Sequence, residues 1–242
     1  MSESVRLVSV NIEFNKHLDR VENFFNAIQP DVVLLQEVLK ADVPRLAGAL
    51  GAASTYFAPM TLYVSGDTEA ACGTCIISRL PVERAETHYY FGDGKNLRIA
   101  VADRGDTFDR VLSYCDVEKG GEIFRIGTTH FTWTPDGDPD DTQWKDLGAL
   151  FSALDSAGEM TLAGDFNAPR GRPVFTKLTE RLTDNIPAHY TSSIDPTLHR
   201  KASLDLMVDG LFTTSGYVAT GVELISGVSD HCAIVGNIAK TA

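Results

Sequence analysis

The sequence predicts an α/β fold in which two β-sheets pack face to face and helices cover their outer faces. The composition, 43% hydrophobic and 22% charged over 242 residues, is typical of a globular protein with a full core. Both halves of the chain repeat one pattern: a helix with an apolar stripe, a fully apolar strand, and a carboxylate where that strand ends. No linker-like or low-complexity tract divides the chain, so residues 1–242 are expected to form a single domain.

The first half opens with a strand-like run at 5–10 that ends at Asn11 and Glu13. A helix is expected next, because apolar residues recur at helical spacing up to Pro30: Leu18, Val21, Phe24, Phe25 and Ile28. Residues 32–35 form a continuous apolar run, which indicates a strand buried on both faces, and Glu37 follows it. A short helix over 43–50 precedes strand-like runs at 55–64, 73–78, 83–90, 96–102, 111–117 and 123–129.

The second half opens with a helix that Gly158 ends, marked by Trp144, Leu147, Leu150, Phe151 and Leu154. The apolar run 160–163 then breaks at Gly164 and is followed by Asp165 and Asn167, and Pro169 turns the chain away. A helix at 173–182, a polar segment to 200, and strands at 204–208, 217–224 and 233–238 complete the chain.

The net charge of −12 argues against a protein that holds nucleic acid over a broad basic face. It leaves open an enzyme that meets phosphates locally through bound cations. No apolar run reaches the roughly 20 residues of a membrane span. The N-terminal residues lack the pattern of a signal peptide, so a cytoplasmic location is expected unless a leader was removed.

Two further motifs each leave alternatives open. Cys72 and Cys75 form a C-x-x-C motif without a second pair, so small buried hydrophobes are favoured over a zinc or redox site. The acidic loop 136–141 begins like a calcium loop, but Asp141 stands where that loop needs glycine. A solvated loop is therefore favoured there over a calcium site.

Polar residues lie at the ends of several predicted strands: Asn11, Glu13, Glu37, His130, Asp165, Asn167, Asp205, Asp230 and His231. Each has an alternative role as a turn residue, a helix cap, a surface acid or a satisfied core histidine. Their joint occurrence favours one shared pocket that holds a cation. Carboxylate and amide oxygens suit Mg²⁺, which Mn²⁺ could replace, with Glu37 as the best ligand, helped by Asn11 and Asp230.

Such a pocket could hydrolyse phosphate esters by in-line attack of water, without a covalent intermediate. Asp165 would hold and activate the water, and Asn167 would fix its direction. His231 would neutralise charge on a non-bridging oxygen and be oriented by a carboxylate, for which Asp205 is the candidate. The cation would polarise a phosphoryl oxygen.

The segments VRLVSVNIE, VVLLQEV, GTCIISRLP, GTTHF, LAGDFNAP, SLDLMV and SDHCAI occur in this order. As a set, which spans 5–238, they resemble the endonuclease/exonuclease/phosphatase superfamily with the DNase I-like fold. The resemblance implies a four-layered α/β/β/α sandwich of two mainly antiparallel mixed sheets and Mg²⁺-dependent cleavage of phosphoesters.

The resemblance also implies a role for each matching residue. Asn11 and Glu37 fall on metal-site positions, and Glu13 falls on a third acidic position that is more often Asp. His130 falls where the family places a residue that contacts the phosphate. The remaining matches are the nucleophile-orienting pair Asp165 and Asn167, the supporting acid Asp205, and the closing pair Asp230 and His231.

The substrate stays open at this stage. A nuclease acting on DNA is the leading hypothesis, and a phosphatase or phosphodiesterase on small or lipid-linked phosphates, such as inositol phosphates or sphingomyelin, is the alternative. A binding module that has kept the fold without catalysis is a third. Arg170 and Arg200 lie near the predicted pocket and could contact a phosphate or solvate a loop. No obligate protein partner is implied.

Overall fold

The computed structural model describes residues 3–66, 68–101, 104–201 and 204–241. In this part of the chain the strands form two six-stranded sheets. The first sheet has the order β11 (Tyr217–Ile225), β12 (Ala233–Lys240), β1 (Val5–Asn11), β2 (Val32–Leu39), β4 (Thr68–Ser78) and β3 (Ser54–Ser65). The second has the order β5 (Val82–Phe91), β6 (Arg110–Lys119), β7 (Glu122–His130), β8 (Thr161–Asp165), β10 (Asp209–Thr213) and β9 (Thr183–Asp184).

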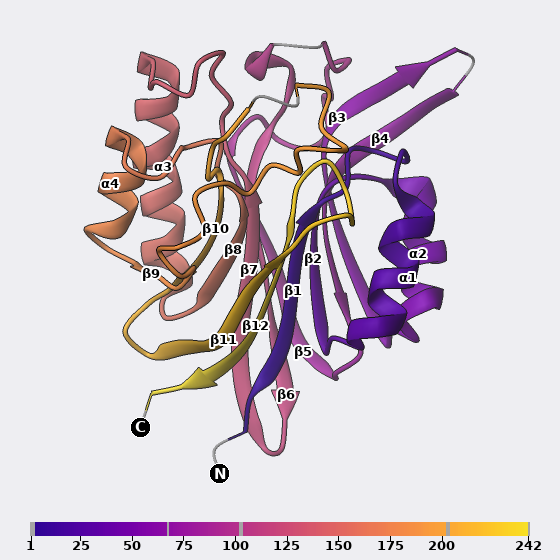
Figure 1. Cartoon of the computed structure of the whole chain (residues 1–242), viewed down its shortest axis with the longest axis vertical. Helices are drawn as coiled ribbons and strands as arrows, with labels where there is room; N and C mark the ends of the chain where they lie inside the picture. The colour runs from indigo at the N-terminus through magenta and orange to yellow at the C-terminus, as the bar shows by residue number, and fades with distance from the viewer. Residues whose placement is uncertain (1–2, 67, 102–103, 202–203, 242) are drawn as a thin grey trace.

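The molecule has four layers, which confirms the predicted α/β/β/α sandwich (Figure 1). Helices α1 (Leu18–Ile28) and α2 (Val43–Leu50) cover the outer face of the first sheet, and α3 (Asp141–Ala157) and α4 (Pro173–Thr179) cover the second. The other helical segments are the 3₁₀ turns η1 (Lys40–Asp42) and η2 (Gly105–Thr107). None of the helices in the described residues is both long and apolar enough to span a bilayer.

The continuous apolar sequence of β2 follows from its place between two cores. Val33 and Leu35 pack in the cluster under α1 and α2, whereas Val32 and Leu34 pack in the cluster between the two sheets. Because neighbouring residues of a strand point to opposite faces, a strand buried on both sides needs apolar residues at every position. The sandwich therefore explains why β2 lacks the alternation of a half-exposed strand.

Parallel strand pairs at the centre of each sheet bring polar residues to one rim. β1 and β2 are parallel and joined through α1, and β7 and β8 are parallel and joined through α3. The carboxyl ends of parallel strands meet at the same edge, so all four strands end at the top of Figure 1, away from the start of β1. Across the sheet interface, the Gln36 side chain donates a hydrogen bond of 2.9 Å to Thr128.

Two predicted strands are wrong, and two observed strands were not predicted. Residues 96–101 form no strand, apart from one isolated bridge between Ile99 and Leu62, and residue 102 lies outside the described residues. The strand expected at 204–208 is absent, and β10 begins at Asp209 instead, where the backbone can pair with Asp165 of β8. The short strand β9 pairs with β10.

Candidate active site

Four polar side chains from the ends of the parallel strands meet at this rim. Asn11, His130 and Asp165 are the last residues of β1, β7 and β8, and Glu37 lies in an irregular stretch of β2 between Leu35 and Val38. The Asn11 amide donates to Asp165 Oδ2 over 3.1 Å. His130 Nε2 lies 3.6 Å from that same oxygen and 3.9 Å from Glu37 Oε1. The two sheets thus contribute equally to one polar cluster.

Backbone conformation at the rim is unusual. Among the described non-glycine residues, positive φ angles occur at Glu13 (48°), Phe14 (63°), Glu37 (55°) and Asn167 (47°), and otherwise at the helix-ending Gln29. L-residues rarely adopt such angles, and those that do so concentrate at functional sites. At Glu37 the unusual backbone angle coincides with a break in the regular pairing of β2 with β4, between Leu35 and Val38.

Asp165 and Asn167 are held as a unit. The backbone N–H of Asn167 donates to Asp165 Oδ1 over 2.9 Å, while Asn11 occupies the other carboxylate oxygen. The Asn167 side-chain amide donates to the Phe131 carbonyl over 3.0 Å. The Asp165 carboxylate is therefore fixed in orientation before any substrate binds, which is what a group that positions a water requires.

His231 pairs with Asp209, so the prediction that Asp205 orients this histidine is wrong. His231 Nδ1 lies 2.7 Å from Asp209 Oδ2, and both side chains are buried. Asp205 is exposed, four residues before the start of β10. The cause is the register of β10: Asp209 is the residue opposite Asp165, and that position puts its carboxylate inside the cluster.

The two buried histidines carry opposite protonation states. Burial, with the nearby Arg110, lowers the pKa of His130 to about 4, although Asp165 acts in the opposite direction. Burial also disfavours the charged form of His231, but the charge and hydrogen bond of Asp209 outweigh it, and the pKa of His231 lies well above its usual value. Near neutral pH, His130 is thus neutral and His231 is a cation.

Three carboxylates crowd the other side of the rim. Burial raises the pKa of Glu37 to about 7, and the negative charges of Asp230 and Asp165 act in the same direction. Burial likewise raises the pKa of Asp230, with a contribution from the charge of Glu13. Crowded carboxylates whose charged forms are disfavoured are the environment that a bound divalent cation relieves, and their oxygen donors fit Mg²⁺.

Eight of the eleven predicted residues line one cleft of about 490 Å³, and the three exceptions are Asn11, Asp205 and Arg170. Its walls include Glu13, Glu37, His130, Asp165, Asn167, Arg200, Asp230 and His231. Asp205 does not line it. Arg170 does not either, because its guanidinium holds the loop after β9, bound to Asp184 and to the carbonyls of Pro187, Ile186 and Tyr190. Its assignment to substrate binding is therefore wrong.

Several lining residues were missed in the sequence: Phe14, Lys16, Tyr63, Arg104, Phe108, Arg110 and Trp133. Arg110 is fully buried, and its guanidinium donates to the carbonyls of Gly105, His130 and Phe131. Phe14 and Tyr63 stack with ring centroids 4.5 Å apart. Single residues in loops carry no periodic sequence signal. Asp209 lies just before an apolar run, so its place at the start of a strand could have been predicted.

The acidic loop and the cysteines have local roles. In the loop, Asp140 accepts from the Gln143 N–H and so caps α3, and Asp138 pairs with Arg172. Cys72, Cys75, Cys115 and Cys232 are free and buried. Burial raises the pKa of the Cys75 thiol to about 12 and that of Cys72 well above its usual value, so the thiols are not ionised at neutral pH.

Comparisons with known proteins agree with this architecture. The sequence profile described as "Endonuclease/Exonuclease/phosphatase family" matches residues 8–231. No curated protein sequence gives a significant match. Among solved structures, an endonuclease/exonuclease/phosphatase from Bacteroides vulgatus superposes with a TM-score of 0.75 at 17% identity, covering 99% of this chain and 100% of that one.

Two further solved structures of similar fold carry names that refer to different molecules, DNA and sphingomyelin. D. rerio TDP2, complexed with a single-strand DNA product, superposes with a TM-score of 0.69 at 16% identity, covering 98% of this chain and 99% of that one. Sphingomyelinase C from Streptomyces griseocarneus gives the same TM-score, identity and coverage. At these identities the likeness concerns the fold.

Proposed function

This chain belongs to the endonuclease/exonuclease/phosphatase family of hydrolytic phosphoesterases, and we propose on that premise that it is a Mg²⁺-dependent phosphodiesterase that uses direct in-line attack by water. The observation that carries the proposal is the meeting of Glu37, Asp165 and His231 in one cleft, although they come from three distant parts of the sequence.

Asp165 is the group that holds the attacking water and accepts its proton. Its carboxylate is fixed by Asn11 and by the Asn167 N–H, so its free lone pairs point in a defined direction. His231, as a buried cation paired with Asp209, places positive charge against a non-bridging oxygen of the phosphate. Neutral His130, 3.6 Å from Asp165, is suited to contact another phosphate oxygen by hydrogen bonding.

The cation site is assigned to Glu13, Glu37 and Asp230, with Asn11 beside them. The raised pKa of Glu37, about 7, supports this assignment, because burial and the charges of Asp230 and Asp165 disfavour its ionised form, which a bound cation would stabilise. A bound Mg²⁺, or Mn²⁺ in its place, would polarise a phosphoryl oxygen and stabilise the leaving alkoxide.

DNA is the substrate we propose first. Cationic side chains from separate loops line the cleft: Lys16, Arg104, Arg200 and Lys201. They could offset locally the net charge of −12. The stacked Phe14 and Tyr63 offer an aromatic surface on which a base could stack. A neighbour of similar fold, TDP2, is complexed with a DNA product.

A small or lipid-linked phosphate is the second candidate. Val64, Ile99 and Val101 are exposed, Ile99 by 54%, and two of them, Val64 and Val101, line the cleft. Exposed apolar side chains beside a phosphate site suit a substrate with an apolar part. Sphingomyelinase C has the same fold, and an acidic protein attracts a polyanion such as DNA less strongly.

Hydrolysis of a nitrophenyl phosphodiester, with Mg²⁺ and with EDTA, tests the proposal. Asp165→Asn and His231→Ala should each lower turnover by about 10³-fold or more, with unfolding temperatures close to that of the parent. Unchanged rates in both variants, or no metal-dependent turnover in the parent, would favour the binding module. Plasmid nicking and release of headgroups from sphingomyelin vesicles then separate the two substrates. The cytoplasmic location stays a prediction from the N-terminal sequence.

A further inference from the structure

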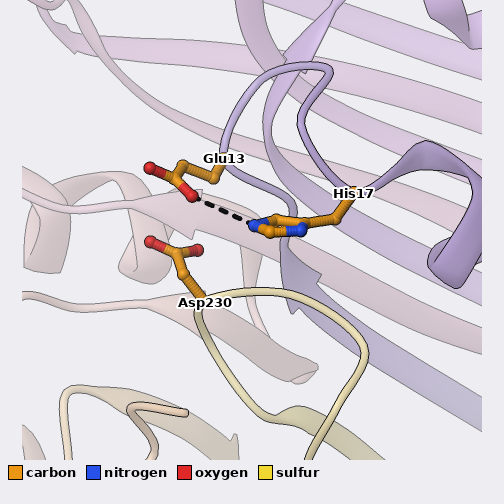
Figure 2. A group of neighbouring side chains, drawn as sticks. All are labelled: Glu13, His17 and Asp230. Carbon is orange, nitrogen blue, oxygen red and sulfur yellow. Dashed lines mark hydrogen bonds and ion pairs between the residues drawn. The ribbon is translucent and has the colours of Figure 1, made fainter. Parts of the chain in front are cut away.

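The side chain of His17 lies beside the proposed cation site and is not used to cap its own helix. It is the residue before α1, and its side chain makes no capping hydrogen bond to that helix. The ring instead turns back toward Glu13, with Nε2 at 3.1 Å from Oε2, and only 13% of each side chain is exposed (Figure 2). This orientation directs a ring nitrogen to the place where Glu13 presents its carboxylate.

Asp230 completes a group of three donors from the opposite side. It comes from the loop before β12, and its carboxylate faces Glu13 and His17 in Figure 2. One ligand atom from each of the three residues lies within 4.8 Å of the other two. Only 7% of Asp230 is exposed, and the Ser229 hydroxyl donates a hydrogen bond to its Oδ1.

We propose that His17 supplies a nitrogen ligand to the cation held by Glu13 and Asp230, and thereby makes this site prefer Mn²⁺ to Mg²⁺. The inference rests on the proposed function for the presence of a cation, and it adds His17 and the ion preference. Mg²⁺ and Mn²⁺ both favour carboxylate oxygen, but Mn²⁺ is a transition metal and accepts an imidazole nitrogen more readily than Mg²⁺ does. If only oxygen atoms held the cation, replacing His17 would leave the ratio of Mn²⁺ to Mg²⁺ affinities unchanged.

A structural ion pair is the competing explanation. Glu13 also pairs with Lys16 through its other oxygen, Oε1, so the loop could use Glu13 only to organise local charges. The Lys16 side chain is 53% exposed, however, and leaves Oε2 to His17. In this explanation, replacing His17 lowers the stability of the metal-free protein and leaves the ratio of Mn²⁺ to Mg²⁺ affinities unchanged.

The test measures metal binding rather than turnover. Mn²⁺ affinity is obtained from EPR titration of the full chain, and Mg²⁺ affinity from competition, for the parent, His17→Gln and His17→Asn. We expect the variants to lose about tenfold in Mn²⁺ affinity and less than about twofold in Mg²⁺ affinity. His189→Gln is the matched control, an exposed histidine outside the residues that line the cleft, and should change neither affinity.

Electron spin-echo modulation of bound Mn²⁺ gives a second readout. The parent should show coupling to a histidine nitrogen that is reduced in both His17 variants and kept in His189→Gln. Absence of nitrogen coupling in the parent overturns the assignment of His17, whatever the folding of the variants, as does an unchanged affinity ratio. If the parent binds neither ion, the proposed function fails as well; if it binds both without nitrogen coupling, only the role of His17 fails.

Discussion

His231 depends on Asp209 for both its charge and its orientation. The 2.7 Å contact at Nδ1 fixes the ring, and the carboxylate keeps a buried imidazole protonated. Asp209→Asn should therefore lower turnover by about 10²–10³-fold and shift the pKa of His231 downward, because the charge of Asp209 is the largest effect that opposes burial. Phosphodiester kinetics and NMR titration of the His231 ring would measure the two effects.

Asp205→Asn is the matched control for this prediction, because Asp205 is exposed and lies four residues away. It should leave both the rate and the His231 titration as they are in the parent. If Asp205→Asn lost activity and Asp209→Asn kept the activity of the parent, the pairing of His231 with Asp209 would be contradicted.

The raised pKa of Glu37 makes stability depend on pH. In the metal-free protein this carboxyl keeps its proton up to about pH 7, whereas the unfolded chain releases it near 4.5. Between these values the folded state binds more protons, so the free energy of unfolding falls as pH rises, by on the order of 3 kcal/mol at most. Urea unfolding in EDTA at pH 5 and pH 7.5 should show this loss, and Glu37→Gln should reduce it. Parallel pH profiles for the two proteins would refute the assigned environment.

At the scale of elements, one strand explains why sequence reasoning chose the wrong acid to support His231. The expected strand 204–208 is apolar enough to be one, but pairing with β8 selects Asp209–Thr213 instead. Register is decided by the neighbouring strand, and the sequence of the strand itself does not contain that information. The wrong choice of Asp205 follows directly from the wrong start of the strand. By contrast, β2 and β8 were predictable because strands buried on both faces are continuously apolar.

Close packing between β7 and β8 requires glycine at position 164. A Cβ there would lie 2.1 Å from the Thr129 carbonyl oxygen of the paired strand. Gly164→Ala should push β8 away from β7, lower the free energy of unfolding by more than about 2 kcal/mol and displace Asp165, with loss of activity. Urea unfolding and phosphodiester kinetics measure both effects.

Gly148 offers the matched substitution, since a Cβ added at this position in α3 meets nothing within 4 Å. Gly148→Ala should raise the free energy of unfolding by about 0.5–1 kcal/mol through helix propensity and leave activity unchanged. Similar losses in both variants would indicate that the contact with Thr129 is not what requires glycine at 164.

At the scale of the whole molecule, the sandwich was predictable and the walls of its cleft were not. The repeated pattern of helix, apolar strand and terminal carboxylate predicts that the polar strand ends gather along one edge of the sandwich. In the structure β2 is parallel to β1 and β8 is parallel to β7, which explains why Glu37 and Asp165 share a site. Lys16 and Arg104 reach the cleft from loops whose paths depend on tertiary packing, so no local pattern marks them.

The charge distribution leads to a prediction that separates the proposed substrates. The chain carries a net charge of −12, yet Arg104 and Lys201 line the cleft. If DNA is the substrate, changing both to Gln should raise KM for an oligonucleotide with little change in kcat. The slope of log(kcat/KM) against log salt should become shallower by about 1.4, since each contact between a cation and a single-strand phosphate contributes about 0.7. Lys177→Gln with Lys240→Gln, outside the lining residues, removes the same charge and should leave the slope unchanged. Equal slopes in all three proteins would show that Arg104 and Lys201 do not contact a polyanion. The exposed side chains of Val64 and Val101 would then be the better guide to the substrate.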